Sequence, residues 1–345
     1  MLFRSGANVT TSGTQTYSGA VTLGGDRTLT GSTITNSSTI TGAGFSLTET
    51  GNAVFNGAIS GVNNLSVSGT TSLGADVSTT GTQTYTGDVT VNSAARTLTT
   101  TGDNVTFSGT VNSDSGGARN LTIATGTAAT VQFGGTVGNS NALGAIAITG
   151  TSAALDLNAA ISNASSLSVS GASDLGASVT TSGAQTYTGA VTLSADSTLT
   201  SSSSGNITFS STVDSSGSAR ALTVNTSGTT TFGGAVGANS PYLASVTTNS
   251  GGTTVINGGS VKTTGTQTYG DAVTLGADTT LTGSAFAFSN TVNAVDATDR
   301  NLTFGTGSGN ATFAGAVGTT FNLGTITNIA GQTLTFSDSV TANTI

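Results

Sequence analysis

The sequence predicts an all-β fold in which short parallel strands stack into a β-solenoid. Thr28-Leu29-Thr30 and Ser66-Val67-Ser68 each place one aliphatic residue between two small polar residues, which is the period-two pattern of a short strand. Such runs recur about every six residues, so three of them make a coil of about 18–22 residues and the chain holds about 17 coils. Dense Thr, Val, Gly and Ser disfavour helix throughout.

The first part of the chain shows the expected strands in order. Gly, Asn, Asp or Ser fills many of the gaps between them and supplies turns. The residues expected to point into the core are Val21, Leu23, Leu29, Ile34, Ile40, Phe45, Leu47, Val54, Ile59, Leu65, Val67, Leu73 and Val77.

A longer repeat overlies the coils. The sequence Gln-Thr-Tyr ends at Tyr17, Tyr85, Tyr187 and Tyr269, at separations of 85−17 = 68, 187−85 = 102 and 269−187 = 82 residues. These steps indicate duplicated blocks of about four to five coils, with whole coils gained or lost. An equivalent strand follows each block start, and its alternation predicts inward Val89, Val191 and Val273 and outward Thr90, Thr192 and Thr274.

We expect the chain to consist of two segments. Residues 1–5 are interpreted as a non-native segment from sequence assembly, because Leu2-Phe3-Arg4-Ser5 can be encoded by the end of a common sequencing adapter, and they lack the features of a signal peptide. Residues 6–345 are expected to form one continuous β-solenoid made of duplicated multi-coil blocks. The pattern runs to Ile345 without a polar cap, which is typical of a fragment of a longer protein.

Composition excludes several functions. The 345 residues include 7 Lys and Arg, 15 Asp and Glu, and no His or Cys. The chain therefore cannot build a Ser-His-Asp or Cys-His nucleophile, a His-containing zinc site or a thiolate metal site. Seven basic residues are too few for a nucleic-acid interface, and no apolar stretch is long enough for a transmembrane helix.

The repeated blocks resemble a known class of protein. Thr-Gln-Thr-Tyr, the strand at residues 272–281 and the Phe-Gly-Gly-Ala-Val-Gly run at residues 232–237 are similar to the repeat region of large secreted bacterial adhesins of the filamentous-haemagglutinin type. The resemblance covers nearly the whole chain. It implies a right-handed parallel β-helix, exported by an outer-membrane transporter, that supports cell attachment or biofilm formation.

The carboxylates are candidates for chemistry, but their pattern favours structural roles. Asp26, Asp76, Asp196 and Asp278 each follow Gly or Ala after a strand, as turn carboxylates do. Asp296, Asp299 and Arg300 form the densest charged cluster, interpreted as a local surface ion pair. Gly24-Gly25-Asp26 approaches a calcium-binding nonapeptide only once and incompletely.

Three other features have alternative interpretations. The four tyrosines are either sugar-stacking platforms or corner residues that cover apolar neighbours, and packing is favoured. The equivalent arginines Arg119, Arg220 and Arg300 are expected to bond turn carbonyls. Thr-x-Thr triplets suggest an ice-binding face, which requires one triplet in register in every coil; Thr-Gln-Thr recurs only once per block, so this function is not expected.

We therefore expect the extracellular, cell-surface stalk of a secreted adhesin-like protein, with no catalytic, cofactor-binding or metal-binding residues. The expected partners are host or environmental glycans or other cell surfaces and, during secretion, an outer-membrane transporter; end-to-end self-association is also expected because uncapped coils expose unpaired strand edges. The alternatives are a carbohydrate-active β-helix enzyme and a self-assembling surface or biofilm matrix fibre.

Overall fold

The chain folds as an all-β solenoid. The computed structural model describes residues 3–5 and 7–345, and every regular element in these ranges is a β-strand. The parallel strands stack in about 16 turns of a right-handed β-helix, which confirms the predicted fold class. The described residues contain no helix that is both long and apolar enough to cross a bilayer. Two compact units divide the chain, residues 1–172 and 173–345.

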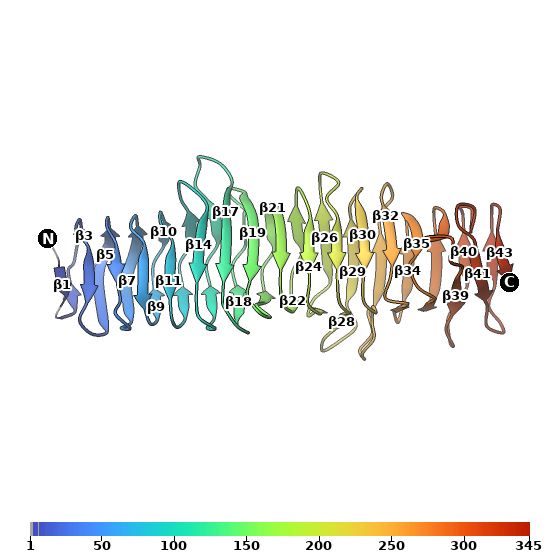
Figure 1. The fold of residues 1–345 in the computed structure, drawn as a ribbon, viewed down its shortest axis with the longest axis horizontal. Coiled ribbons are helices and arrows are strands. Elements are labelled where there is room, and N and C mark those ends of the chain that lie inside the picture. The colour runs from blue at the N-terminus through green and yellow to red at the C-terminus, as the bar shows by residue number, and fades with distance from the viewer. Residues whose placement is uncertain (1–2, 6) are drawn as a thin grey trace. The chain divides into compact units, whose positions relative to one another are not determined.

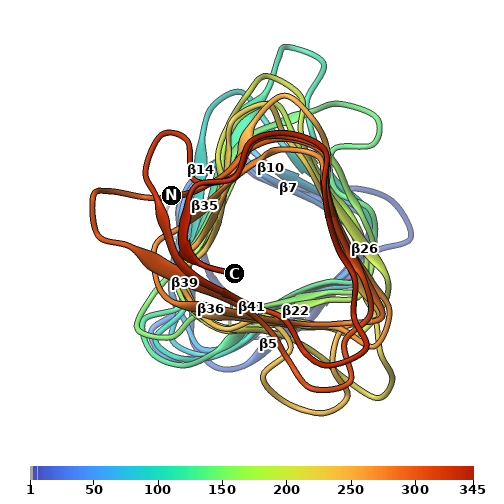
Figure 2. The same cartoon turned by 90° about the vertical axis from the view of Figure 1, so that its right-hand side faces the viewer.

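The first unit contains three parallel ladders, which lie along three sides of each turn (Figures 1 and 2). Ladder A joins β2 (Val9–Thr10), β5 (Arg27–Asn36), β7 (Leu47–Phe55), β9 (Leu65–Val67), β12 (Gln83–Tyr85), β15 (Val105–Phe107), β18 (Thr130–Phe133) and β20 (Ala154–Leu157). Ladder B joins β3 (Gln15–Tyr17), the second halves of β5 and β7, β10 (Thr71–Leu73), β13 (Val89–Val91) and β16 (Val111–Ser113). Ladder C joins β1 (Phe3–Ser5), β4 (Val21–Leu23), β6 (Ile40–Thr41), β8 (Ile59–Val62), β11 (Val77–Thr79), β14 (Arg96–Thr99), β17 (Arg119–Ala124), β19 (Leu143–Thr149) and β21 (Ile161–Val169).

The second unit repeats this plan with three further ladders. Ladder D joins β22 (Ser173–Leu175), β25 (Val191–Leu193), β28 (Val213–Ser215), β33 (Ser260–Lys262), β36 (Thr279–Thr282), β39 (Arg300–Phe304), β41 (Leu323–Thr327) and β43 (Ala342–Thr344). Ladder E joins β24 (Gln185–Tyr187), β27 (Ile207–Phe209), β30 (Thr229–Phe232), β32 (Thr253–Ile256), β35 (Ala272–Leu275) and β38 (Val292–Ala294). Ladder F joins β23 (Val179–Thr181), β26 (Ser197–Ser201), β29 (Ala221–Asn225), β31 (Ser245–Thr248), β34 (Thr266–Tyr269), β37 (Ala285–Phe288), β40 (Ala311–Phe313) and β42 (Leu334–Phe336).

Alternation along the strands fills the core of each unit. Val89, Val191 and Val273 are buried, whereas the Thr residues that follow them are half-buried on the outside, which confirms the predicted register. Two inward predictions were wrong. Phe45 is 37% exposed because it lies in the turn before β7, after two residues with positive φ, and Val54 faces outward because its neighbours Ala53 and Phe55 take the inward positions.

Aromatic side chains stack from turn to turn inside the solenoid. On ladder A, Tyr85, Phe107 and Phe133 follow one another with centroid separations of 5.3 and 5.2 Å and nearly parallel rings. In the second unit, Phe209 lies 5.4 Å from both Tyr187 and Phe232. Since aligned parallel strands lie about 4.8 Å apart, flat rings in equivalent positions meet in an offset stack that adds to burial.

A Val-Gly pair recurs at residues 137–138, 236–237 and 317–318, and the fold gives it a steric explanation. Gly138 adopts φ +70°, and a Cβ there would collide with the backbone carbonyl oxygen of Asn163 in the next turn. Gly318 has φ +69° and meets the carbonyl of Thr341 in the same way. Glycine is therefore required at this corner both for its left-handed conformation and for the close approach of the next turn.

The blocks do not contain whole coils, which corrects the predicted duplication pattern. In the first unit Tyr17 aligns with Asn36 on ladder B, but Tyr85 aligns with Val67 on ladder A. In the second unit Tyr187 lies on ladder E and Tyr269 on ladder F. Within each unit, successive Gln-Thr-Tyr sequences thus occupy different sides of the solenoid.

The start of the chain is only partly described. Phe3–Ser5 forms a strand that pairs in parallel with Val21–Leu23 on ladder C. Residues 1, 2 and 6 lie outside the described residues. The interpretation of residues 1–5 as non-native, and of residues 6–345 as one continuous solenoid, stays a prediction.

Candidate functional site

The Gln-Thr-Tyr sequences form a buried hydrogen-bonded unit rather than a ligand platform. Tyr187 is fully buried, and its hydroxyl donates to Gln185 Oε1 at 3.1 Å. Gln185 Nε2 donates to the carbonyl of Thr200 in the next turn at 2.9 Å, with longer contacts of 3.2 Å to Thr181 Oγ1 and 3.4 Å to the Val179 carbonyl. The same contacts recur around Gln83 and Gln267. The amide therefore ties its own turn to the next.

The phenol groups of Tyr85, Tyr187 and Tyr269 are buried and do not reach the surface. Burial raises the pKa of Tyr85, Tyr187 and Tyr269, so their phenols stay neutral at physiological pH. The sugar-platform alternative is wrong for these three residues, and the favoured packing role is confirmed. Tyr17 is half-buried. The glutamine two residues earlier was the missed signal, because it is the side chain that satisfies the buried hydroxyl.

The turn carboxylates bond the following turn. Asp26 Oδ1 accepts the backbone N–H of Ser46 at 2.9 Å, and Asp76 Oδ1 accepts that of Thr97 at the same distance. Asp196 and Asp278 accept the N–H groups of Ala221 and Asn301. The predicted turn role is confirmed, and it extends between turns, since each carboxylate satisfies a donor at a corner where the ladder is interrupted.

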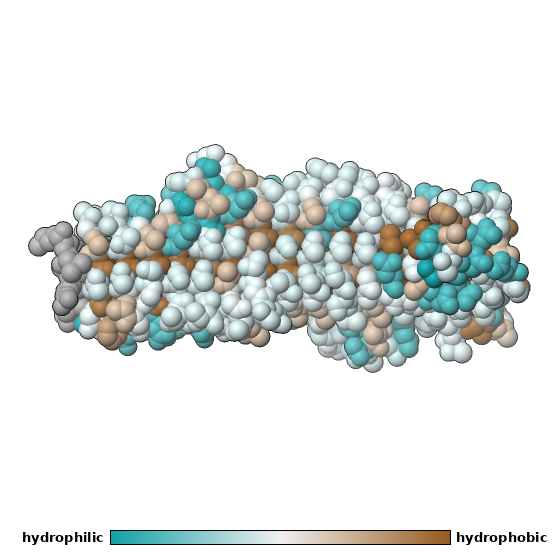
Figure 3. Space-filling model, viewed as in Figure 1, coloured by the Kyte–Doolittle hydropathy of each residue, from teal (hydrophilic) through white to brown (hydrophobic). Residues whose placement is uncertain are grey.

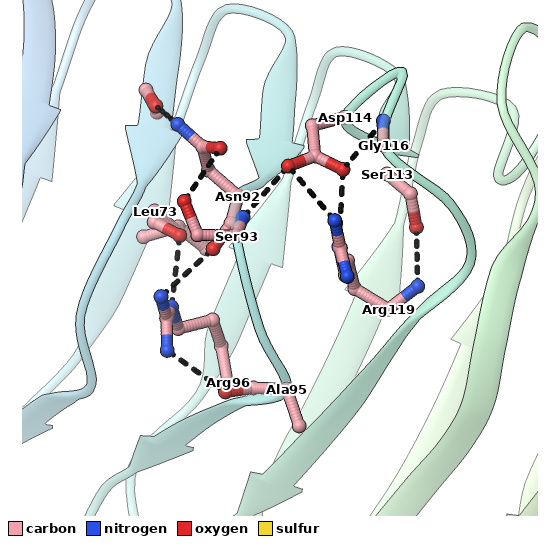
Figure 4. Close-up of polar contacts among 10 residues, drawn as sticks. Leu73, Asn92, Ser93, Ala95, Arg96, Ser113, Asp114, Gly116 and Arg119 are labelled. Carbon is pink, nitrogen blue, oxygen red and sulfur yellow. Dashed lines mark hydrogen bonds and ion pairs between the residues drawn. The ribbon is translucent and has the colours of Figure 1, made fainter.

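The densest polar network joins two projecting loops of the first unit, which follow β13 and β16 (Figure 4). Asp114 accepts the backbone N–H of Ser93 at 2.7 Å through Oδ2 and that of Gly116 at 3.1 Å through Oδ1. Arg119 Nε donates to Asp114 Oδ1 at 3.0 Å. Arg96 donates to three carbonyls, of Leu73, Asn92 and Ala95, at 2.8–3.1 Å. The charged side chains thus bond to groups of the two loops and to the Leu73 carbonyl at the end of β10.

Electrostatics keep this network ionised. The Ser93 N–H and the Arg119 guanidinium, in that order, hold the pKa of Asp114 below its ordinary value. A general acid needs a carboxyl that is still protonated near neutral pH, and Asp114 is not. The arrangement holds the two loops together, and its carboxylate is not available as a general acid.

The hydrogen-bond partners of the equivalent arginines Arg119, Arg220 and Arg300 differ from the turn carbonyls that the sequence predicted. Arg119 pairs with a carboxylate, not with turn carbonyls, whereas Arg96 and Arg27 do bond backbone carbonyls. Arg300 Nη2 lies 3.6 Å from Asp296 Oδ1, which confirms a surface ion pair, and Asp299 accepts a bond from Asn343. Arg220 Nε is buried without a partner. The contacts differ because Asp114 and Asp296 lie in the loops before Arg119 and Arg300, whereas residues 216–219 before Arg220 contain no acid.

A hollow of about 240 Å³ lies on ladder F of the second unit. Small Ala285 and Ala287 leave it open between larger neighbours on the adjacent strands. No lining residue is titratable, so the hollow has no acid–base chemistry. Its lining comprises Thr266, Gln267, Thr268, Ala285, Phe286, Ala287, Asn310 and Thr312.

The most regular outer feature is a pair of parallel rows of Ser and Thr side chains on ladder A, called here the hydroxyl ranks. The ladder aligns the first rank, Thr28, Thr48, Ser66, Thr84 and Thr106. A second hydroxyl residue follows each of these two positions later, namely Thr30, Thr50, Ser68, Thr86 and Ser108. Triplets do occur once per turn over these five strands, which corrects the expectation that only Thr-Gln-Thr would supply them. Uncharged side chains of this kind give the pale surface of Figure 3.

The described residues contain no group of three or more His, Cys, Asp or Glu side chains that could hold a metal ion. The expected absence of catalytic, cofactor and metal residues stays a prediction. No protein family, curated protein or solved structure matches the chain.

Proposed function

We propose that the chain is a segment of the extracellular stalk of a secreted adhesin-like protein, which supports cell attachment or biofilm formation. The observation that carries this proposal is that polar side chains in the core and at the corners form hydrogen bonds from turn to turn. Gln185 in the core, Asp76 at a corner and Arg96 each bond a neighbouring turn. A spacer needs this kind of repeated nearest-neighbour cohesion, whereas an enzyme needs free groups that converge on one point.

Two further features support a secreted stalk. The outer side chains are short and uncharged, and charged residues are 6% of the sequence. The chain has no Cys, so it could pass a transporter unfolded without forming disulfides in an oxidising compartment. The repeated blocks resemble adhesins of the filamentous-haemagglutinin type, and from that resemblance come the outer-membrane transporter and the glycan or cell-surface partners of this proposal.

A whole-turn deletion tests the proposal. Val89 aligns with Val111, so removal of residues 89–110 takes out 111−89 = 22 residues and brings Val111 into the place of Val89. Tyr85 would then face Phe133 in place of Phe107. We expect cells that carry the shortened protein to attach as the wild type does, because a spacer tolerates the loss of one turn.

The matched control removes residues 89–99, which breaks the register and should abolish folding and attachment. A whole-turn variant that keeps the wild-type circular dichroism spectrum but loses attachment would overturn the proposal, since the removed turn would then carry the binding function. If the chain is an enzyme, the purified protein should release sugar from a panel of polysaccharides. If it is a matrix fibre, solutions of the purified protein should contain fibres.

The hydroxyl ranks favour ice binding as a second candidate function. Nine of the ten side chains in the two ranks make no hydrogen bond within the described protein, the exception being Ser68, which accepts from Gly51. Their spacing is set by the sheet, at about 4.8 Å between strands and about 6.6 Å along each strand. Replacing Thr48 and Thr84 by Lys should abolish inhibition of ice recrystallisation, while Thr90→Lys on ladder B should not. Absence of inhibition by the wild type would exclude this function.

A further inference from the structure

One acidic side chain lies inside the core of the first unit. Glu49 of β7 is fully buried and takes an inward place on ladder A that Leu29 and Val67 hold in the adjacent turns. It is the sole glutamate of the sequence. An ionised carboxylate in such a place loses its hydration and needs paired charges or several donors in return.

The surroundings of Glu49 supply a single donor. Asn36 of β5, also buried, donates from Nδ2 to Glu49 Oε1 at 2.8 Å. The remaining atoms of this pair, Asn36 Oδ1 and Glu49 Oε2, have no hydrogen-bond partner. Both are acceptors when the carboxylate is ionised, so the pair has one donor too few.

One proton corrects this mismatch. With a proton on Oε2, Glu49 becomes a donor, and the acceptor still vacant beside it is Asn36 Oδ1. Paired edge to edge, a carboxylic acid and a primary amide each use one donor and one acceptor, so the neutral pair is complementary, whichever way the amide is oriented. The site therefore matches the neutral acid better than the carboxylate.

Among the described side chains, no ion pair offsets a charge on Glu49. Leu29 of β5 and Val67 of β9 flank it on its own ladder, and the titratable group that interacts with it is Tyr17 of β3. The pKa of Tyr17 is raised by burial and then by the charge of Glu49. Both ion pairs among the described residues involve other side chains.

We propose that Glu49 and Asn36 form a pH-dependent switch that holds the turns of β5, β7 and β9 together while Glu49 is neutral and loosens them when it ionises. The switch goes beyond the stalk function, because it would make the stability of one part of the solenoid respond to the surrounding medium. Burial raises the pKa of Glu49 from 4.5 to about 8, against the smaller opposing effect of the Asn36 bond.

The direction of the pH dependence follows from proton linkage. Between pH 4.5 and about 8 the folded chain keeps a proton that the unfolded chain has released. Across this window each rise of one pH unit lowers the folding equilibrium constant about tenfold, and above it the dependence levels off. The stabilisation is complete below the unfolded-state pKa and is lost as the pH rises through the folded-state pKa.

Because the sequence holds one glutamate, ¹³C-labelled glutamate gives a carboxyl signal that reports Glu49 in the intact chain. We expect this NMR signal to titrate near pH 8. Urea denaturation of Glu49→Gln, compared with wild type from pH 5 to 9, should show that the variant lacks the decline, while the exposed control Asp26→Asn should retain it.

A signal that titrates near pH 4.5, or a stability difference between wild type and Glu49→Gln that is constant with pH, would overturn the proposal. The NMR titration needs only the wild-type chain, so it decides the question even if the Gln variant fails to fold.

Discussion

Removal of one buried hydroxyl tests the role of the Gln-Thr-Tyr sequence. In Tyr187→Phe the ring stays stacked on Phe209, but Gln185 Oε1 loses its donor at 3.1 Å. A buried acceptor without a partner costs about 1–3 kcal/mol of the free energy of unfolding. Because the phenyl ring keeps almost all the packing, we assign the whole expected loss to this one unpaired oxygen.

The reciprocal change should cost more. Gln185→Leu leaves the Tyr187 hydroxyl without its acceptor and the Thr200 carbonyl without its 2.9 Å donor. Two unpaired buried groups correspond to about 2–6 kcal/mol. The double variant removes both ends of the Tyr–Gln bond, so its cost should fall short of the sum of the single costs by about 0.5–3 kcal/mol.

Urea denaturation followed by circular dichroism measures these differences in the intact chain. Thr186→Ala is the matched control, because Thr186 lies between the two residues but points outward, and it should stay within about 0.5 kcal/mol of wild type. A neutral Tyr187→Phe, or strict additivity of the two single changes, would refute the view that the pair is one cohesive unit.

Three further outcomes follow from the core and the corners. Val191→Asp buries an unpaired charge and should cost about 3–5 kcal/mol in denaturation experiments, whereas Thr192→Asp should be nearly neutral; equal losses would mean that the register is wrong. Phe209→Ala empties a place between two stacked rings and should cost about 3–5 kcal/mol, and Phe209→Leu clearly less; equal costs would deny the ring stack a role. Asp76→Ala should lose about 1 kcal/mol and Asp76→Asn less, because Asn keeps an acceptor for the Thr97 N–H; a stable Ala variant would contradict this corner contact.

The sequence was sufficient for the fold class and for most of the core. Alternation in Ala-Val-Thr-Leu places Val191 and Leu193 inside, and the regular pitch indicates stacked coils. Ala53-Val54-Phe55 was harder, since all three residues are apolar and the period alone does not say which ones point inward. The alignment of turns was also beyond reach, because it depends on loop lengths that vary from turn to turn.

The polar contacts were the least predictable part. Gln185 looks like a surface residue, and its partners are largely backbone carbonyls that are brought together only by the stacking of turns. Asp114 and Arg119 lie at the two ends of one β16–β17 connection, but the N–H of Ser93 that completes the network comes from another loop. For Glu49 a signal did exist, because Thr-Glu-Thr puts an acid where equivalent triplets carry an apolar residue.

Immunogold electron microscopy of intact cells that produce the protein tests the proposed stalk most directly. Antibodies would be raised against the outward loops that contain Ser93 and Gly116, which project from the first unit. The account predicts gold label outside the outer membrane of unpermeabilised cells, and loss of the label after protease treatment of the cell surface. Label that appears only after permeabilisation, and that survives the protease, would contradict it.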